Sequence, residues 1–191
     1  MKSYMQIISV NSITINQYLK NRNSMNEALS TLTSYLSFKL GDETFAANVS
    51  NVLNILEMTN ITKVPKAPNY MKGVINLRGT VLPLIDTRIK FGLTPTEFTP
   101  NTCILVLEIQ IKGESLQVGG LVDSVQEVLE IEPKQILPAP NIGSEFKSEF
   151  ISGMFKPNEE QFIMILDLDK VFSVEELIEV QKKSKNCYLK Y

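Results

Sequence analysis

The chain has 191 residues, of which 19 are basic and 21 acidic, so its formal net charge is −2. It contains no histidine and only two cysteines, which excludes Ser-His-Asp catalysis, a His-ligated zinc site and a Cys₄ metal site. Binding to a phosphate backbone needs clustered basic residues and a membrane span needs ~18 consecutive apolar residues, so we expect a soluble cytoplasmic protein that binds no nucleic acid, metal or cofactor.

Residues 1–34 are rich in asparagine, serine and threonine and carry only a faint helical pattern, at Met25, Leu29 and Leu32. This composition favours a mobile N-terminal extension over residues 1–34. An amphipathic helix that docks on a partner is the alternative interpretation of the same pattern.

Strand-like alternation begins at residue 35. Leu36, Phe38 and Leu40 alternate with polar residues, and the chain then turns at Gly41-Asp42 into a second apolar run. Further β-type runs are separated mostly by glycine- or proline-bearing segments and cover residues 81–85, 102–109, 116–122 and 162–168. Short and frequent strands predict an all-β barrel or sandwich, in which Cys103 is a small core residue.

The chain changes character near its end. Ser173 and Glu176 have the spacing of a capping box, in which the serine caps a helix and the glutamate reaches back to the cap. Leu177 and Ile178 continue at helical spacing. We therefore predict a C-terminal helix followed by a frayed tail within residues 173–191.

The two halves of the chain resemble each other. The same elements recur in the same order: a Val-x-x-apolar-apolar-Glu strand, a turn containing Ala-Pro-Asn, a glycine, and an apolar-apolar-Asp strand with phenylalanine five residues after the aspartate. The first copy places them at 52–57, 67–69, 73 and 84–91, and the second at 125–130, 139–141, 153 and 165–172. Since the repeat is too long for a solenoid, we predict two similar small β-barrels packed together, over about residues 35–98 and 99–172.

Asp86 and Asp167 stand at equivalent positions of the two copies, as the two catalytic carboxylates of aspartic proteases do. Arg88, however, stands where that family needs glycine, and a cation beside the carboxylate opposes a shared proton. The sequence therefore favours capping of the following turn or helix by both aspartates. We expect no catalytic residue and no enzyme activity.

Residues 76–79, Asn-Leu-Arg-Gly, lie between two apolar strands. Gly79 can adopt a positive φ, which suits a tight turn. Arg78 is then either a solvated charge on an exposed hairpin or a planar five-donor group that a rigid turn presents to a partner's carboxylate or carbonyl oxygens. The residue pattern leaves both interpretations open.

The stretch from Lys66 to Phe91, with Gly-Val-Ile-Asn-Leu-Arg-Gly at its centre, resembles the signature of the CheW-like chemotaxis coupling proteins. The resemblance covers about residues 35–178 and extends to the motifs at 120–125, 136–140, 151–154 and 165–169. It implies two SH3-like five-stranded β-barrels packed together, with a C-terminal helix. It also implies a non-catalytic adaptor that bridges the cytoplasmic signalling tip of chemoreceptors and the regulatory domain of the chemotaxis histidine kinase and assembles both into arrays.

The resemblance also implies, by position, a partner-binding surface at Val52, Asn54, Gly73, Asn76, Arg78 and Gly79. Their neighbours Ile55 and Leu56 are expected to serve packing. Family members usually carry glutamate where this chain has Asn54, and the change removes a charge able to pair with a cationic partner. The alternative is therefore a CheW-like adaptor for a different receptor–kinase system, which the same residues would serve. Other CheW-like domains, arranged in rings, are a further candidate partner, and the membrane is reached only through the receptors.

Overall fold

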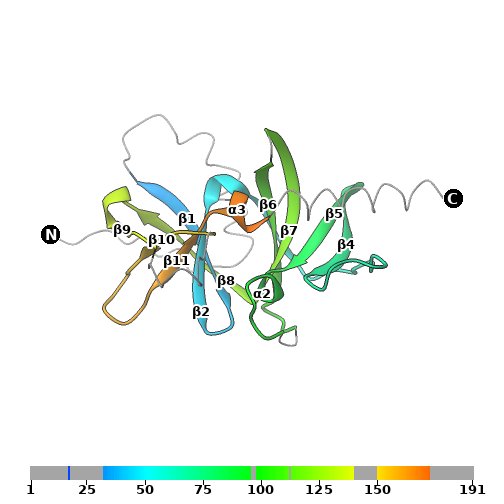
Figure 1. Ribbon diagram of the computed structural model, residues 1–191, viewed down its shortest axis with the longest axis horizontal. Coiled ribbons are helices and arrows are strands. Elements are labelled where there is room, and N and C mark those ends of the chain that lie inside the picture. Colours follow the sequence, from blue (N-terminus) through cyan, green and yellow to red (C-terminus); the bar gives the residue numbers. More distant parts are fainter. Residues whose placement is uncertain (1–16, 18–31, 96–97, 112, 140–149, 173–191) are drawn as a thin grey trace.

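The computed structural model describes residue 17 and residues 32–95, 98–111, 113–139 and 150–172. Within these ranges the regular structure is almost entirely β, and it forms two sheets that lie side by side (Figure 1). The all-β prediction is therefore confirmed. The extension predicted over residues 1–34 lies outside the described residues except for residues 17 and 32–34, and so does the helix predicted within 173–191.

The first sheet, called sheet A below, has six strands, in the order β8 (Ser124–Ile131), β1 (Thr33–Leu40), β2 (Glu43–Asn48), β11 (Ile163–Leu166), β10 (Ile151–Phe155) and β9 (Ile136–Leu137). The second, sheet B, has five, in the order β3 (Val52–Glu57), β6 (Cys103–Ile111), β7 (Glu114–Val122), β5 (Thr80–Asp86) and β4 (Met71–Leu77). Within the described ranges, three short helices join strands, η2 (Val49–Asn51), α2 (Thr87–Lys90) and η3 (Pro133–Gln135), and a fourth, α3 (Leu168–Val171), follows β11.

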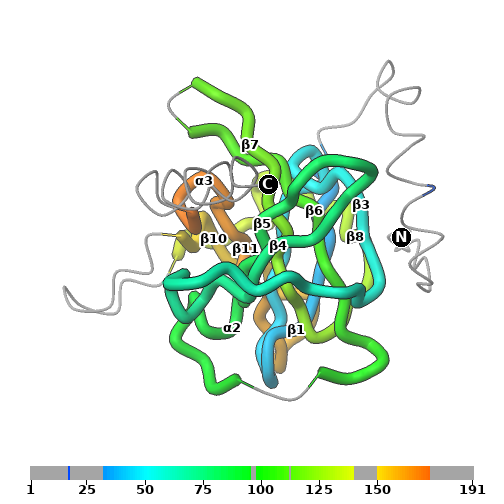
Figure 2. Tube along the Cα trace, turned by 90° about the vertical axis from the view of Figure 1, so that its right-hand side faces the viewer, coloured from blue at the N-terminus to red at the C-terminus, as the bar shows by residue number. Residues whose placement is uncertain are grey.

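Strands are exchanged between the two sequence repeats. β1 and β2 precede the first-copy motifs but pair with second-copy strands in sheet A, β1 antiparallel to β8 and β2 parallel to β11. β6 and β7 precede the second-copy motifs but complete sheet B, β6 antiparallel to β3 and β7 parallel to β5, as Figure 2 shows from the sheet B end. The sheets are thus not divided at the expected boundary of residues 35–98 and 99–172. Alternation along a strand specifies the face that is buried, and it does not specify the neighbouring strand.

The largest apolar cluster lies between the two sheets. It takes in one face of the exchanged strands, where Leu36 of β1 and Leu105 of β6 are 0% and 1% exposed. Full burial of a leucine contributes about 1.5–3 kcal/mol to folding, so this cluster packs the sheets firmly against each other. Cys103 belongs to the same cluster, as predicted, and burial raises the pKa of its thiol to about 11.

The sequence repeat is matched by a structural repeat. β4 and β10 each have a register shift beside a glycine, Gly73 in one and Gly153 in the other. The backbone N–H of Asp86 donates to the carbonyl of the residue before β4 at 2.7 Å, and that of Asp167 donates to the residue before β10 at 2.8 Å. α2 and α3 follow these aspartates. The internal similarity therefore reflects two copies of one structural unit.

Candidate partner-binding surfaces

Arg78 and Gly79 are the two central residues of the turn between β4 and β5, since Leu77 pairs with Thr80. Their φ angles are 53° and 88°, as in the type I′ turns that match the twist of a hairpin. Asn76 Oδ1 accepts a hydrogen bond from the Gly79 N–H at 2.7 Å. The turn backbone is therefore fixed, and it brings three of the predicted site residues, Asn76, Arg78 and Gly79, together at an exposed position.

Arg78 adopts a conformation that does not suit arginine. A residue with a Cβ in the left-handed region costs about 1–2 kcal/mol, and Asn-Gly is the pair preferred in this kind of turn. Among the described non-glycine residues only Lys66 shares a positive φ. Because backbone strain of this kind clusters at functional sites, the β4–β5 turn is a candidate contact site.

The predicted site residues of β3, Val52 and Asn54, contribute to packing and local hydrogen bonding more than to the exposed surface. Val52 is 0% exposed and packs in the cluster between the sheets, so it does not reach a partner. Asn54 is half-buried beside a register shift, and its Oδ1 accepts from the Ile55 N–H at 3.0 Å. Ile55 packs between the sheets, while Leu56 packs against the interior of sheet B, which agrees with the packing role predicted for both.

Gly73 is a point of close backbone approach. It is buried in β4, and a Cβ added there would lie 2.2 Å from the carbonyl oxygen of Thr62. Thr62 and Val74 exchange two backbone hydrogen bonds of 2.9 Å, which hold the segment before β4 against the strand. Gly73 therefore has a structural role: without a side chain it lets the backbone at Thr62 pack directly against β4.

The six predicted residues consequently do not form one exposed surface. Val52 and Gly73 are buried, and Asn54 is half-buried on β3 with its Oδ1 used by the Ile55 N–H. The exposed part of the predicted surface is the β4–β5 turn.

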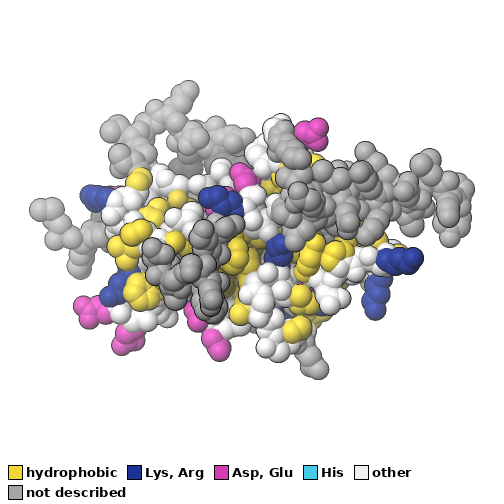
Figure 3. Space-filling view, viewed as in Figure 1, with side chains coloured by type: hydrophobic (Ala, Val, Ile, Leu, Met, Phe, Trp, Pro, Cys, Tyr) yellow, Lys and Arg dark blue, Asp and Glu magenta, His cyan; other side chains and the backbone are white. Residues whose placement is uncertain are grey.

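A second exposed surface, which the sequence analysis did not predict, lies on sheet A. Leu137 and Phe162 are 44% and 46% exposed. Leu137 pairs with Met154, and Met154 with Met164, so these side chains share one face of the sheet. Met154 and Met164 are half-buried, and Met164 also packs against the cluster between the sheets. Phe162 precedes β11 on the same face, and Lys156 Nζ lies 5.7 Å from the centre of its ring. Figure 3 shows hydrophobic side chains exposed at this end of the molecule. We call Leu137, Met154, Phe162 and Met164 the sheet A patch.

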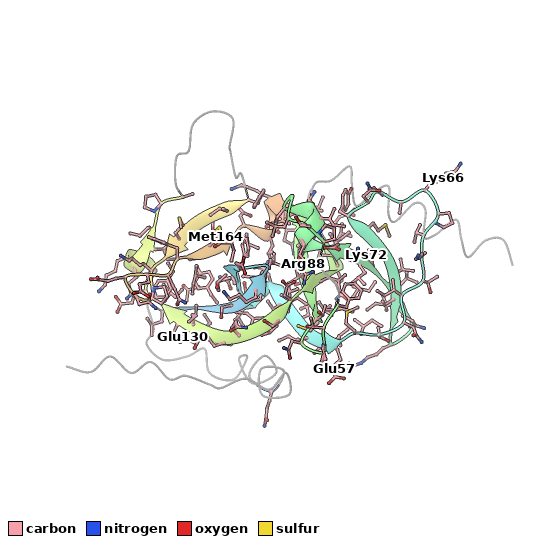
Figure 4. All side chains as sticks on the ribbon, turned by 90° about the horizontal axis from the view of Figure 1, so that it is seen from below. Glu57, Lys66, Lys72, Arg88, Glu130 and Met164 are labelled. Atoms are coloured by element: carbon pink, nitrogen blue, oxygen red, sulfur yellow. The ribbon has the colours of Figure 1, made fainter. Side chains whose placement is uncertain are left out.

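The balance of charge differs between the β3–β5 segment and the segments around β8, η3 and the β10–β11 loop. No acidic residue occurs between Met58 and Ile85, whereas four basic ones do: Lys63, Lys66, Lys72 and Arg78. Acidic residues prevail along β8, in the turn after it and in the β10–β11 loop, at Glu127, Glu130, Glu132, Glu159 and Glu160. Figure 4 shows Lys66 and Glu130 at opposite ends. Because charge complementarity selects partners, the two ends suit different partners.

Asp86 and Asp167 have structural surroundings. One oxygen of Asp86 accepts from two backbone N–H groups of α2 at 3.1 and 3.2 Å, and the other lies 2.9 Å from Lys72 Nζ. Asp167 makes no side-chain cap and lies 2.6 Å from Lys170 Nζ. The capping prediction is therefore confirmed for Asp86 and wrong for Asp167. Each carboxylate has its own lysine, unlike a pair that shares a proton, and in the described part of the chain no three His, Cys, Asp or Glu residues gather as metal ligands would.

These features define a class of protein. Two packed sheets built from one repeated unit present a cation on a rigid turn at one end and an apolar patch at the other. Both are features by which a protein can hold other proteins. They are typical of an adaptor that acts through protein–protein contacts.

Comparison with known proteins gives the family. Residues 34–176 match the family model described as the CheW-like domain. The chain is 33% identical over 152 residues to the chemotaxis protein CheW of Klebsiella aerogenes, over 80% of this chain and 89% of that protein. It is 38% identical over 141 residues to CheW of Rhizobium meliloti, over 74% of this chain and 88% of that protein. The crystal structure of the scaffolding protein TtCheW from Thermoanaerobacter tengcongensis matches with a TM-score of 0.66 and 29% identity, over 76% of this chain and 95% of that one.

The chain belongs to the CheW-like family. It is a non-catalytic chemotaxis coupling scaffold, and its two sheets are consistent with the SH3-like barrels that the resemblance implied. The family couples chemoreceptors to the chemotaxis kinase. Of the helices in the described ranges, none has the length and apolar character needed to cross a membrane.

Proposed function

We propose that this chain couples the cytoplasmic signalling tip of chemoreceptors to the regulatory domain of the chemotaxis histidine kinase, and that it does so in the cytoplasm. The observation that carries the proposal is the β4–β5 turn, where a strained Arg78 is exposed on a fixed backbone. Membership of a coupling family supports it.

The β4–β5 turn is suited to the receptor. Its guanidinium offers five donors in a planar fork that can bind a carboxylate through two parallel hydrogen bonds. Because Asn76 already holds the turn, little conformational freedom is lost on binding. Asn54 is uncharged in this chain, so Arg78 is the charged contact among the six predicted residues.

The sheet A patch is suited to the kinase. Aromatic and methionine side chains are enriched where proteins meet, and the patch combines an exposed phenylalanine with two half-buried methionines on the same face. The patch lies on sheet A and the Arg78 turn on sheet B. One molecule can therefore hold two partners at once, which an adaptor must do.

A different receptor–kinase system is the second candidate, and Asn54 is the observation that favours it. Where the family usually has glutamate, this chain presents a neutral amide, and the partner that meets it need not be cationic. Both candidate functions would use the same contact surfaces, so only the identity of the bound receptor and kinase distinguishes them. Other CheW-like domains, including copies of this chain, are candidate neighbours in an array.

Co-sedimentation with a receptor cytoplasmic fragment and the cognate histidine kinase tests the proposal, with bound protein and kinase activity measured together. We expect the wild-type chain to join the pellet and to raise kinase activity. Arg78→Ala should lose binding to the receptor fragment and keep binding to the isolated kinase regulatory domain, whereas Phe162→Ala should show the reverse. Lys134→Ala removes an exposed cation in η3, outside both surfaces, and is the matched control.

Each outcome has a definite meaning. Receptor binding without kinase activation would favour an adaptor for another output. Binding to neither protein would contradict the coupling proposal. Loss of both contacts in either single variant would contradict the assignment of one surface to each partner.

A further inference from the structure

Two contacts in equivalent places join sheets A and B outside their apolar cluster. In each, the short helix that follows one sheet reaches the hairpin of the other sheet. α2 follows β5 of sheet B and reaches the β1–β2 turn through Asp123, while α3 follows β11 of sheet A and reaches β6 directly. Figure 1 shows α2 and α3 at opposite ends of the seam between the sheets.

The α2 contact is an ion pair in which the arginine is buried and Asp123 is 20% exposed. Arg88 has only 8% of its side chain exposed and donates from Nε and Nη2 to Asp123. Asp123 lies where the chain passes from β7 of sheet B to β8 of sheet A. Its other oxygen accepts the Gly41 N–H at 2.7 Å, and its own N–H donates to the Lys39 carbonyl at 3.0 Å. One carboxylate therefore ties together α2, the crossover and the β1–β2 hairpin.

The α3 contact is a single exposed hydrogen bond. Asp169 Oδ1 accepts from the Gln110 N–H at 2.8 Å. Gln110 corresponds to Gly41, because each follows by five residues an equivalent leucine, Leu105 in β6 and Leu36 in β1. Water competes for an exposed bond of this kind, so it stabilises the seam little.

We propose that Arg88 and Asp123 are positioning residues that set the angle between sheets A and B and thereby allow both partners to bind at once. The proposal rests on the proposed function, since it needs the Arg78 turn on one sheet and the sheet A patch on the other. The rest of the seam is an apolar cluster. Apolar packing is non-directional, whereas a largely buried pair with fixed hydrogen bonds is satisfied in one arrangement.

The angle can be measured directly with a pair of spin labels. In the full chain with Cys187→Ser, labels at Lys63→Cys and Lys134→Cys report the distance between the sheet B side and the sheet A side by double electron–electron resonance. Cys103 is buried and its raised thiol pKa keeps it unreactive. We expect a narrow distance distribution in this background and a distribution at least about twofold broader after Arg88→Met. Asp169→Ala, at the equivalent contact, should leave it narrow.

Binding separates a positioning role from a structural one. In Arg88→Met, affinities for the receptor fragment alone and for the kinase regulatory domain alone should stay within about twofold of wild type. Recruitment of the kinase to receptor-bound protein should fall by about tenfold. Asp123→Asn should act in the same direction, and it keeps an oxygen that can accept the Gly41 N–H. It therefore carries the test if Arg88→Met does not fold.

Unchanged distances in both seam variants would overturn the proposal, and so would equal broadening in Asp169→Ala. Broadened distances with undiminished joint binding would also overturn it, as would a parallel loss of both single-partner affinities. If the wild-type chain binds neither protein, the proposed function fails, and the distance measurement still decides whether Arg88 and Asp123 set the angle.

Discussion

The two copies of the structural unit share their strands and differ at their hairpin tips. In sheet B a two-residue turn joins β4 and β5; Asn76 closes it by one hydrogen bond, and Arg78 stands at its tip. In sheet A a longer loop joins β10 and β11; Asn158 Oδ1 closes it by accepting two backbone N–H groups at 3.0 Å, and Glu159 and Glu160 stand within it. One framework therefore presents a cation at one end and carboxylates at the other. The shared strands determine the fold, whereas the hairpin connections differ in sequence and can bind different partners.

The largest expected effect concerns the two glycines of the shared framework. Gly73→Ala should lower the free energy of unfolding by about 3 kcal/mol, because the new Cβ meets a backbone carbonyl and the φ of 148° is unfavourable for alanine. Gly153→Ala should lower it by less, about 2 kcal/mol, because the new Cβ would lie 2.5 Å from a methyl of Ile136 and 2.9 Å from the Leu137 carbonyl oxygen, and Gly153 has no positive φ. Urea denaturation of both variants measures the difference. Equal losses would show that the two sites are under the same constraint.

Charge reversal at the tips should separate binding from folding. Arg78→Glu should weaken binding to the receptor fragment by about 2 kcal/mol, as loss of a central arginine contact does. Its stability should stay within about 0.5 kcal/mol of wild type, since the side chain is exposed. Glu159→Lys, at the other tip, should leave receptor binding unchanged. An Arg78→Glu protein that unfolds would instead make Arg78 a structural residue.

Two exposed phenylalanines allow a matched test of the sheet A patch. Phe162→Ala should weaken binding to the kinase regulatory domain by about 1–2 kcal/mol. Phe98 is 50% exposed but lies outside the patch, so Phe98→Ala should have no effect on that binding. Titration calorimetry with the isolated regulatory domain measures both. Comparable losses would show that general surface hydrophobicity, and no particular patch, holds the kinase.

Substitutions of the two aspartates before α2 and α3 should differ less in their effect on the free energy of unfolding than the two glycine substitutions do. Asp86→Asn should lower the free energy of unfolding by about 1 kcal/mol, because it weakens a cap and breaks the pair with Lys72. Asp167→Asn should lower it by less than about 0.5 kcal/mol, since its pair with Lys170 is largely exposed and it caps nothing. Thermal unfolding under identical conditions ranks the two. The reverse order would contradict the capping role of Asp86.

Much of the fold could be predicted from local patterns. Alternation located the β1–β2 hairpin, the apolar run around Cys103 located β6, and Asn-Leu-Arg-Gly located a tight turn with Arg78 at its tip. The exchange of strands could not be predicted, because a strand pattern carries no information on its neighbour. Val52 was expected at a binding surface and is buried, because β3 packs one face between the sheets and the other inside sheet B.

The residues that could not be predicted from the sequence depend on contacts that only the folded chain shows. Arg88 has the usual properties of a surface residue, and it is buried because Asp123, 35 positions away, neutralises it. Phe162 begins the β-type run predicted over 162–168, yet it lies just before β11 and is 46% exposed. Asp167 has the same local sequence position as Asp86, and only the structure shows that its side chain turns to Lys170.

Arg78→Asn is the most direct test of the central claim, which is that Arg78 serves a partner at some expense to the hairpin. Asparagine before glycine is the preferred pair for a type I′ turn, so the urea midpoint should rise by an amount equivalent to about 0.5–1 kcal/mol. Co-sedimentation with the receptor fragment should at the same time fall at least about tenfold. A more stable protein that no longer binds is the predicted result. A variant that binds as well as wild type, or one that is less stable, would contradict the account.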